Sequence, residues 1–483
     1  MLDLRTVRHI HFIGIGGAGL SAMARVLMER GAVVSGSDLT LSPAAEALMR
    51  DGARVYVGHR AENVAGADVV IASSAVREDN VEVQAARAAG IPVLRRAQVL
   101  GQLMEGHIGI AVAGTHGKTT TTAMIATVLW EAGLDPTFIV GGTLVGPGTN
   151  ARAGGGPHFV IEADEYDRTF LALTPRIAVV TNVEHDHPDC YPTFEDFRAA
   201  FAEFVARIPP DGLLVACWDH PVARELGRER RAQGGRVVFY GFAAGGCFAA
   251  LAVTTSPRGG RERGAEWTAR RVHANPSGGT DFYAVRSGRT LGEVRLRVPG
   301  EHNVLNALAA LAVAEEVGVP FPTARAALSG FRGVGRRFEV KGEAEGVVVV
   351  DDYAHHPTEI RATLAAARQR FPGRPVWAVW QPHTYSRTKA LLEEFAEAFD
   401  QADHVVVLPI YAARESDTLG VSSADVVARM RHPDARVVGS REEAVALLGT
   451  EVRPGDVVLT LGAGDGDKVG EWLLEALRRG AEA

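Results

Sequence analysis

Gly114-Thr115-His116-Gly117-Lys118-Thr119-Thr120 is the stretch that decides the fold of this chain. The apolar run 108–112 before it predicts a strand, and the segment 119–130 after it is typical of a helix. A glycine turn at a helix N-terminus presents backbone N–H groups and the positive end of the helix dipole to a phosphate. Lys118 would then reach the terminal phosphates, and the Thr119 hydroxyl would bind a magnesium ion. An ordinary glycine-rich turn without a ligand is the alternative.

A second glycine run, Gly14-Ile15-Gly16-Gly17-Ala18-Gly19, stands between a predicted strand at 9–13 and a predicted helix at 20–30. Asp38 ends the next predicted strand, so the pattern is G-x-G-x-x-G with an acid about 20 residues further on. It predicts a diphosphate at the helix N-terminus and a sugar hydroxyl near Asp38. A UDP-sugar meets that demand as well as NAD does, and a tight turn without a ligand is the structural alternative. Ser73 follows the predicted strand 69–72, whose end faces the same crevice.

Acids and histidines follow two further predicted strands. The strand 158–161 ends in Glu162-Ala163-Asp164-Glu165, and the strand 177–180 ends in Thr181 to His187. Both ends are expected at the sheet edge where the phosphate loop lies. Because Mg²⁺ prefers oxygen ligands together with phosphate, this edge is a predicted magnesium site, with room for a second ion that has an imidazole ligand. Surface histidines without a ligand are the alternative.

Residues 242–300 differ from the segments around them. Gly245-Gly246, Gly259-Gly260 and a predicted strand at 290–298 indicate short antiparallel strands with loose loops that cover the ATP-binding core. Asn303 and Asn306 then lie one turn apart at the start of an alanine-rich helix, where their amides could read a base edge. Capping of that helix by Asn303 alone is the alternative.

Strands and helices alternate in the last third of the chain, which indicates a mostly parallel sheet. Polar clusters follow four of the predicted strands, and they are Asp351 to Pro357, Gln381 to Arg387, Tyr411 to Glu415, and Gly462 to Asp465. Four such clusters on one rim indicate a site that faces another domain.

Length and composition indicate a multidomain cytoplasmic protein. A chain of 483 residues is too long for a single core, and its size predicts roughly three domains. The net charge of -7 argues against a nucleic-acid partner. Because we find no apolar stretch of spanning length and no signal-peptide pattern, we expect no membrane insertion. The cysteines Cys190, Cys217 and Cys247 have no metal-ligand spacing and fit a reducing cytoplasm. A monomer and a homodimer are both compatible with the sequence.

Taken together, these motifs resemble the ATP-dependent Mur ligases of peptidoglycan synthesis, nearly end to end. The block Asp351-Asp352-Tyr353-Ala354-His355-His356-Pro357 is highly specific to the branch that joins L-alanine to UDP-N-acetylmuramate. The phosphate loop is shared more widely, including by folylpolyglutamate synthetases. The resemblance implies an α/β protein with three domains. They are a Rossmann-like UDP-sugar domain at 1–105, a P-loop ATP-binding domain with a mixed sheet and a small β-rich part at 106–328, and a Rossmann-like closing domain at 329–483.

The resemblance also implies a reaction and the residues that serve it. The lactyl carboxylate of UDP-N-acetylmuramate attacks the γ-phosphate of ATP, and the amine of L-alanine then attacks the acyl phosphate. Lys118, Glu162 and His187 are the implied catalytic residues, and one or two Mg²⁺ ions are implied on Thr119, Glu162 and His187. The implied ATP contacts are Gly114, Thr115, His116, Gly117, Lys118, Thr119, Thr120, Asn303, Asn306, Arg336 or Arg337, Asp351 and His355. The implied substrate contacts are Gly14, Gly16, Gly17, Ala18, Gly19, Asp38, Ser73, His383 and Arg387.

The sequence departs from the family pattern at two places. Thr384 stands where many members carry a basic residue, which leaves Arg387 as the basic residue of that segment. Several sister ligases hold a second Mg²⁺ with a carbamoylated lysine, which would fall near Ala200 or Phe201. No lysine occurs between Lys118 and Lys341, and an arginine cannot be carbamoylated because its guanidinium stays protonated.

Two other functions compete with this assignment. A recycling ligase that adds a tripeptide to the same UDP-sugar would share nearly every motif, but it more often carries Phe at the position of Tyr353. A nicotinamide dehydrogenase or NAD sensor is favoured only by the run Gly14 to Gly19.

Overall fold

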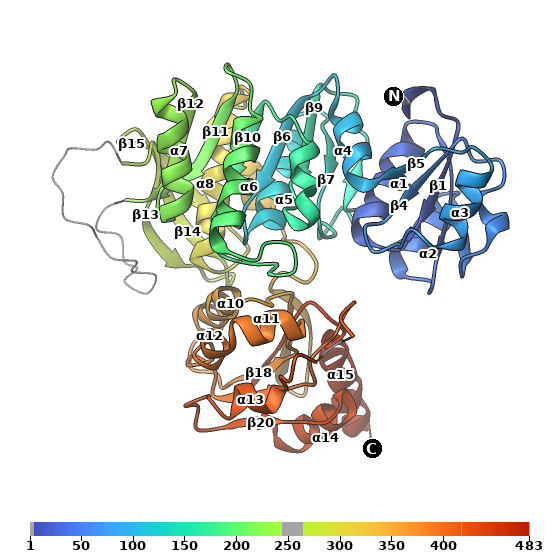
Figure 1. Ribbon diagram of the computed structural model, residues 1–483. Helices are drawn as coiled ribbons and strands as arrows, with labels where there is room; N and C mark the ends of the chain where they lie inside the picture. The colour runs from blue at the N-terminus through green and yellow to red at the C-terminus, as the bar shows by residue number, and fades with distance from the viewer. Residues whose placement is uncertain (1–3, 244–263, 417, 483) are drawn as a thin grey trace.

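The computed structural model describes residues 4–243, 264–416 and 418–482, which form three α/β units (Figure 1). The N-terminal unit is a five-stranded parallel sheet in the order β3-β2-β1-β4-β5. Its strands are β1 (His9–Ile13), β2 (Val33–Asp38), β3 (Arg54–Val57), β4 (Val69–Ala72) and β5 (Val93–Arg95). Its α-helices are α1 (Ala18–Glu29), α2 (Pro43–Arg50), α3 (Val81–Ala88) and α4 (Arg96–Met104). This is the doubly wound, Rossmann-like arrangement that the family resemblance implied for residues 1–105.

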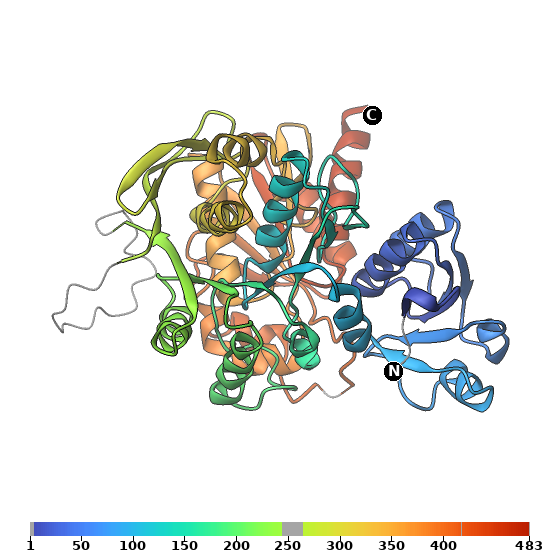
Figure 2. The same ribbon diagram turned by 90° about the horizontal axis from the view of Figure 1, so that it is seen from above.

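The central unit is a ten-stranded mixed sheet in the order β15-β14-β13-β12-β11-β10-β6-β9-β7-β8. Its strands are β6 (Ile108–Ala113), β7 (Thr137–Ile139), β8 (Ala151–Arg152), β9 (His158–Glu162), β10 (Ile177–Val180), β11 (Leu213–Cys217), β12 (Arg236–Phe242), β13 (Trp267–Ala274), β14 (Thr280–Arg286) and β15 (Arg289–Arg295). Its helices are α5 (Lys118–Glu131), the 3-10 helix η3 (Tyr166–Ala172), α6 (Phe194–Ala206), α7 (Pro221–Ala232), α8 (Glu301–Glu316) and α9 (Phe321–Gly330). Seen from above, α5, α8 and α9 lie on one face of the sheet and α6 and α7 on the other (Figure 2).

The antiparallel strands predicted between 242 and 300 are present, but the prediction that they cover the core is wrong. β13 pairs in parallel with β12, and β14 and β15 follow it as antiparallel neighbours, so the three strands extend the edge of the central sheet. Backbone pairing with the exposed edge of β12 therefore decides where this segment lies. The predicted loops at Gly245-Gly246 and Gly259-Gly260, together with Cys247, lie outside the described residues.

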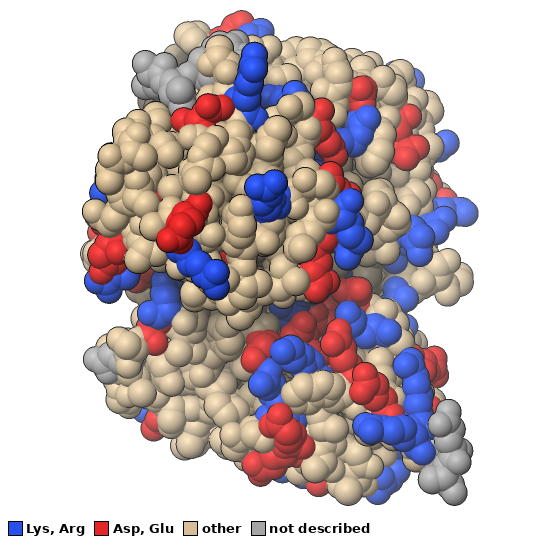
Figure 3. Space-filling model, turned by 90° about the vertical axis from the view of Figure 1, so that its right-hand side faces the viewer, with Lys and Arg blue, Asp and Glu red and all other residues tan. Residues whose placement is uncertain are grey.

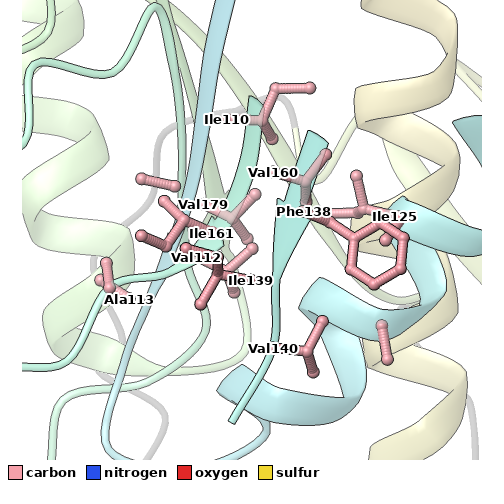
Figure 4. Close-up of a cluster of buried hydrophobic side chains, with 14 of the residues drawn as sticks. Ile110, Val112, Ala113, Ile125, Phe138, Ile139, Val140, Val160, Ile161 and Val179 are labelled. Atoms are coloured by element: carbon pink, nitrogen blue, oxygen red, sulfur yellow. The ribbon is translucent and has the colours of Figure 1, made fainter. Parts of the chain in front are cut away.

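The core of the central unit holds the phosphate loop in place. Ile110 and Val112 of β6 are fully buried against Ile125 of α5, Phe138 of β7 and Val160 of β9 (Figure 4). Strands of a parallel sheet that are covered by helices on both faces read as continuous apolar runs, as β6 and β10 do. Each such side chain stabilises the fold by roughly 1.5–3 kcal/mol on burial. The loop between β6 and α5 is thus anchored at both ends by well-packed elements.

The C-terminal unit is a six-stranded sheet in the order β16-β17-β21-β18-β19-β20, parallel except for β16. Its strands are β16 (Glu339–Ala344), β17 (Val347–Asp352), β18 (Val376–Trp380), β19 (His404–Val407), β20 (Ala435–Val437) and β21 (Val457–Leu461). Its helices are α10 (Pro357–Arg370), α11 (Tyr385–Ala390), α12 (Leu392–Ala396), α13 (Ser423–Val427), α14 (Arg441–Glu451) and α15 (Asp467–Glu482). The predicted three-unit α/β architecture is confirmed.

The N-terminal unit packs on the central one through α1 against β8 and α4 against η3. The C-terminal unit lies below the central one, with α10 and α11 at the junction (Figure 1). From the side of the N-terminal unit, the surface is hollowed between the upper and lower parts, and charged side chains gather around the hollow (Figure 3). Within the described ranges, no helix has the length and apolar character needed to cross a membrane.

Candidate active site

The phosphate loop is a glycine turn that the neighbouring strand holds in shape. Gly114 and Gly117 have φ angles of 139° and 80°, in the region that favours glycine. A Cβ atom on Gly114 would lie 1.9 Å from Thr181 Oγ1, so the close approach of the two segments also requires glycine there. Thr181 Oγ1 donates to His116 O at 2.6 Å, and His116 N donates to Asn182 Oδ1 at 2.7 Å. The residues after β10 therefore shape the loop, and α5 begins immediately after it at Lys118.

Lys118 lies half-buried among acidic side chains at the start of α5. Its Nζ donates to Gly114 O at 2.6 Å and to Glu165 Oε1 at 2.8 Å. Burial would lower the pKa of Lys118, but Glu165 and then Glu162 raise it, so the ammonium stays charged. The other oxygen of Glu165 is buried without a hydrogen-bond partner among the described residues. An anion at the loop would compete with Glu165 for the lysine.

Thr119 and Glu162, two of the predicted metal ligands, lie side by side. Thr119 Oγ1 donates to Glu162 Oε1 at 3.0 Å, and Gly141 N donates to Glu162 Oε2 at 2.8 Å. Burial raises the pKa of Glu162, although Lys118 opposes that effect. A hydroxyl and a carboxylate oxygen next to a phosphate loop are the donors that Mg²⁺ prefers, so these residues fit the ion.

His187, the third predicted ligand, lies on the other side of Glu165. Its Nε2 is 3.6 Å from Glu165 Oε1 and 3.7 Å from Asp186 Oδ2. Burial would lower the pKa of His187, but Asp186 and Glu165 raise it. Glu165 therefore stands between Lys118 and His187. The structure brings Thr119 and Glu162 together directly, and it connects His187 to Lys118 through Glu165.

Asn303 and Asn306 are buried at the start of α8, and the capping alternative for Asn303 is wrong. Gly300 is the N-cap of α8, so Asn303 lies inside the helix and its Nδ2 donates to Pro299 O at 2.7 Å. Asn306 Nδ2 donates to Asn303 Oδ1 at 3.1 Å, and Thr121 Oγ1 donates to Asn306 Oδ1 at 3.0 Å. The pair thereby links α8 to α5, next to the phosphate loop. Its role toward a base stays a prediction.

The predicted ATP contacts of the C-terminal unit gather around Tyr353 and Glu359. The guanidinium groups of Arg336 and Arg337 each lie 5.2 Å from the Tyr353 ring centre. Arg336 Nε also donates to Asp351 Oδ2 at 3.0 Å. His355 Nδ1 lies 3.3 Å from Glu359 Oε2. These side chains share one end of the unit, as the polar clusters after the strands predicted.

His116 and Arg387 both form contacts between the central and C-terminal units. His116 Nδ1 lies 3.1 Å from Glu359 Oε1, and its Nε2 lies 3.3 Å from Glu184 Oε2. Arg387 Nε donates to Asp186 Oδ1 at 2.9 Å. His116 thus connects the phosphate loop of the central unit to the C-terminal unit.

Sequence reasoning missed the roles of Glu165, Glu184, Glu359 and Asp186. Three of these acids lie within the acid-rich runs 162–165 and 181–187, and Glu359 follows the Asp351 to Pro357 block. The signal was therefore present as a cluster. The sequence does not indicate which acidic side chain pairs with which histidine, lysine or arginine, because that depends on how the central and C-terminal units pack.

The predicted substrate residues of the N-terminal unit meet at one loop. Gly16 N donates to Asp38 Oδ2 at 2.9 Å. A Cβ on Gly14 would lie 3.1 Å from Ser73 Cβ, so Ser73 lines the same turn. Gly17, Ala18 and Gly19 complete the turn and the first residues of α1. Arg96 lies against Gly19 and donates to Asp164 Oδ2 at 2.8 Å, which connects this loop to the central unit.

The other two predicted substrate residues, His383 and Arg387, lie at the junction of the central and C-terminal units. There Arg387 Nη1 donates to His383 O at 2.6 Å.

The fold and this site define a three-unit nucleotide-binding α/β enzyme. Three family descriptions match successive parts of the chain: "Mur ligase family, catalytic domain" at 9–108, "Mur ligase middle domain" at 112–314, and "Mur ligase, glutamate ligase domain" at 336–464. The chain belongs to the Mur ligase family.

Named relatives match along nearly the whole chain. A UDP-N-acetylmuramate--L-alanine ligase of Geobacter sp. (strain M21) is 46% identical over 481 residues, covering 99% of each chain. A protein of the same name from Sorangium cellulosum (strain So ce56) is 48% identical over 465 residues, covering 95% of this chain and 94% of that one.

Solved structures match as well. A UDP-N-acetylmuramate-alanine ligase from Thermotoga maritima has a TM-score of 0.80 at 30% identity and covers 98% of this chain and 100% of its own. A murein peptide ligase from Psychrobacter arcticus 273-4 has a TM-score of 0.71 at 26% identity, with 98% and 99% coverage.

Proposed function

We propose that this protein is an ATP-dependent ligase that joins L-alanine to the lactyl carboxylate of UDP-N-acetylmuramate. The observation that carries the proposal is the convergence of Lys118, Thr119 and Glu162 on a glycine loop that also contacts the C-terminal unit. The names of full-length relatives at 46% and 48% identity support the choice of substrates. We assign UDP-sugar binding to residues 1–105, ATP binding to 106–328, and closure over ATP and the amino acid to 329–483.

The chemistry requires activation of a carboxylate, because a carboxylate is a poor electrophile toward an amine. A lactyl carboxylate oxygen forms a bond to the γ-phosphorus of ATP while the bond to ADP breaks. The amine of L-alanine then forms a C–N bond, inorganic phosphate leaves and the nitrogen loses a proton. Phosphoryl transfer between two anions depends mainly on positioning and charge neutralisation. Lys118 supplies a half-buried positive charge for that purpose, once phosphate oxygens replace Glu165 as its partner.

Thr119 and Glu162 would hold Mg²⁺, with His187 contributing to a second ion next to Glu165 and Asp186. When bound, Mg²⁺ would neutralise charge on the phosphate oxygens during transfer. Arg336 or Arg337, Asp351 and His355 would reach ATP from the C-terminal unit, and Asn303 and Asn306 would contact the adenine. Gly14 to Gly19, Asp38 and Ser73 would hold the UDP-sugar, with His383 and Arg387 near its reactive end.

The similarity to a murein peptide ligase makes a tripeptide-adding enzyme the second candidate. Release of ADP should be measured with ATP, Mg²⁺ and UDP-N-acetylmuramate, adding L-alanine in one arm and a preformed tripeptide in another. We expect turnover with L-alanine and little with the tripeptide. Faster ADP release with the tripeptide than with L-alanine would replace the proposed function with that of the second candidate.

A further inference from the structure

Three side chains with metal-binding atoms meet where the central and C-terminal units touch. His116 belongs to the phosphate loop, Glu184 follows β10, and His356 is the N-cap of α10. One ligand atom of each lies within 4.8 Å of the other two. His116 Nε2 is 3.3 Å from Glu184 Oε2, and His356 Nδ1 is 3.8 Å from the same oxygen. All three lie outside the proposed Mg²⁺ ligand set.

The chemistry of these donors suits a transition metal. Two imidazole nitrogens and one carboxylate oxygen are a ligand set for Zn²⁺ and Co²⁺, whereas Mg²⁺ favours sites that are mostly oxygen. The side chains of His116 and His356 are 12% and 7% exposed, and that of Glu184 is 29% exposed. A cation here would therefore be held inside the junction with one open side for water.

The surrounding groups orient the ligands as they do in known metal sites. His116 Nδ1 lies 3.1 Å from Glu359 Oε1, so its N–H points to Glu359, and a bound ion would displace the proton that Nε2 otherwise shares with Glu184. A carboxylate behind a metal-binding histidine is the usual arrangement around such ions. Thr358 Oγ1 donates to Glu184 Oε2 at 2.7 Å and fixes that carboxylate. Coordination by His356 Nδ1 would replace the hydrogen bond that it accepts from Thr358 N at 3.3 Å, which is long for such a bond.

We propose that His116, Glu184 and His356 form a binding site for Zn²⁺ or a similar transition-metal ion that ties the phosphate loop to the C-terminal unit. Two ligands come from the central unit and one from the C-terminal unit, so the ion binds only when the two units are together. It therefore favours that arrangement by mass action. This site is independent of the identity of the ligase substrates.

Titration of the full-length protein with Co²⁺ in excess Mg²⁺ tests the proposal, because tetrahedral Co²⁺ absorbs visible light far more strongly than hydrated Co²⁺. We expect saturable absorption at one Co²⁺ per chain that Zn²⁺ abolishes. His356→Gln and Glu184→Gln should each weaken Co²⁺ binding by about tenfold or more. His432→Gln is the matched control in the same unit, since His432 pairs with Ala402 O away from the junction. It should bind Co²⁺ like the unaltered protein.

His187→Gln should also retain the signal, which separates this site from the proposed Mg²⁺ ligands. Circular dichroism checks the fold of each variant, and Glu184→Gln serves if His356→Gln unfolds. Absence of the absorption in the unaltered protein would overturn the proposal. So would a signal that survives both junction variants but disappears with Asp281→Asn, because His273, Asp281 and Glu293 form another group of possible ligands. Since only binding is measured, failure here leaves the ligase proposal intact.

Discussion

Arg387 Nε donates to Asp186 Oδ1 at 2.9 Å and Arg387 Nη2 lies 2.8 Å from the same oxygen, so this buried ion pair crosses from the C-terminal unit to the central unit. The two side chains are 7% and 4% exposed. Burial would raise the pKa of Asp186, but Arg387 and His187 hold it well below its usual range. Because both charges are removed from water, the intact pair adds little net stability. Removal of one partner is costly, since it leaves the other charge buried without compensation.

Removal of either partner is therefore expected to disturb closure of the enzyme. Arg387→Ala leaves Asp186 charged and buried, at a cost of about 3–5 kcal/mol to the closed arrangement of the units, which corresponds to a loss of roughly 10²–10⁴ in kcat/KM. Asp186→Asn should lower kcat/KM to a similar degree, and the double variant should be little worse than either single one. Arg361→Ala, at an exposed arginine of α10, is the matched control and should stay within a few-fold of the unaltered enzyme. Additive losses in the double variant would show that the two residues act separately.

Lys118→Ala is expected to abolish ATP use while leaving UDP-N-acetylmuramate binding nearly intact. The lysine lies in the phosphate loop of the central unit, and the proposed UDP-sugar loop lies in the N-terminal unit. Calorimetric titration with each ligand measures the two affinities separately. Lys341→Ala is the control, because Lys341 pairs with Glu471 in the C-terminal unit. Equal loss of both affinities in Lys118→Ala would contradict the assignment of the two ligands to different units.

The pairing of His116 with two acids predicts a stability that falls with rising pH. Burial would lower the pKa of His116, but Glu359 and Glu184 raise it to about 9. A histidine in the unfolded chain has a pKa near 6.5. Protonated His116 therefore stabilises the fold fully below about pH 6.5, and this contribution is lost as the pH rises through about 9. Its size is on the order of 3 kcal/mol.

The comparison with His116→Gln isolates this effect. The difference in melting temperature between the unaltered protein and the variant should shrink between about pH 6 and about pH 10. Glu184 and Glu359 stay ionised throughout that range, since the pKa of each is lowered in the fold. A difference that stays constant with pH would mean that His116 is not held as a cation between them.

Activity is expected to be independent of dissolved bicarbonate. Ala200 and Phe201, near which a carbamoylated lysine would fall, are 2% and 0% exposed in the core face of α6. The chain has no lysine between Lys118 and Lys341. Initial rates should match in CO₂-stripped buffer and after bicarbonate is restored. A large, reproducible recovery on adding bicarbonate would reveal a carbamoylated lysine elsewhere and a different metal site.

Elements with strong local signals could be predicted from the sequence. The strand at 9–13 was predicted to the residue, and α5 extends one residue beyond each predicted end. Apolar runs that end in glycine turns specify such elements locally. The pair of Asp186 and Arg387, which is 201 residues apart in the chain, could not be predicted, because it depends on how two units pack. The capping role for Asn303 was wrong because Gly300, with φ of 91°, starts α8 three residues earlier.

The fate of a carboxylate oxygen tests the proposed reaction most directly. UDP-N-acetylmuramate labelled with ¹⁸O in its lactyl carboxylate should be incubated with ATP, Mg²⁺, L-alanine and the enzyme. The inorganic phosphate should then be analysed by mass spectrometry. If the carboxylate attacks the γ-phosphorus, one labelled oxygen leaves with the phosphate and the other remains in the new amide. We predict one ¹⁸O in each phosphate released, in step with formation of the L-alanine adduct. Adduct formation with unlabelled phosphate would contradict an acyl phosphate and, with it, the central claim.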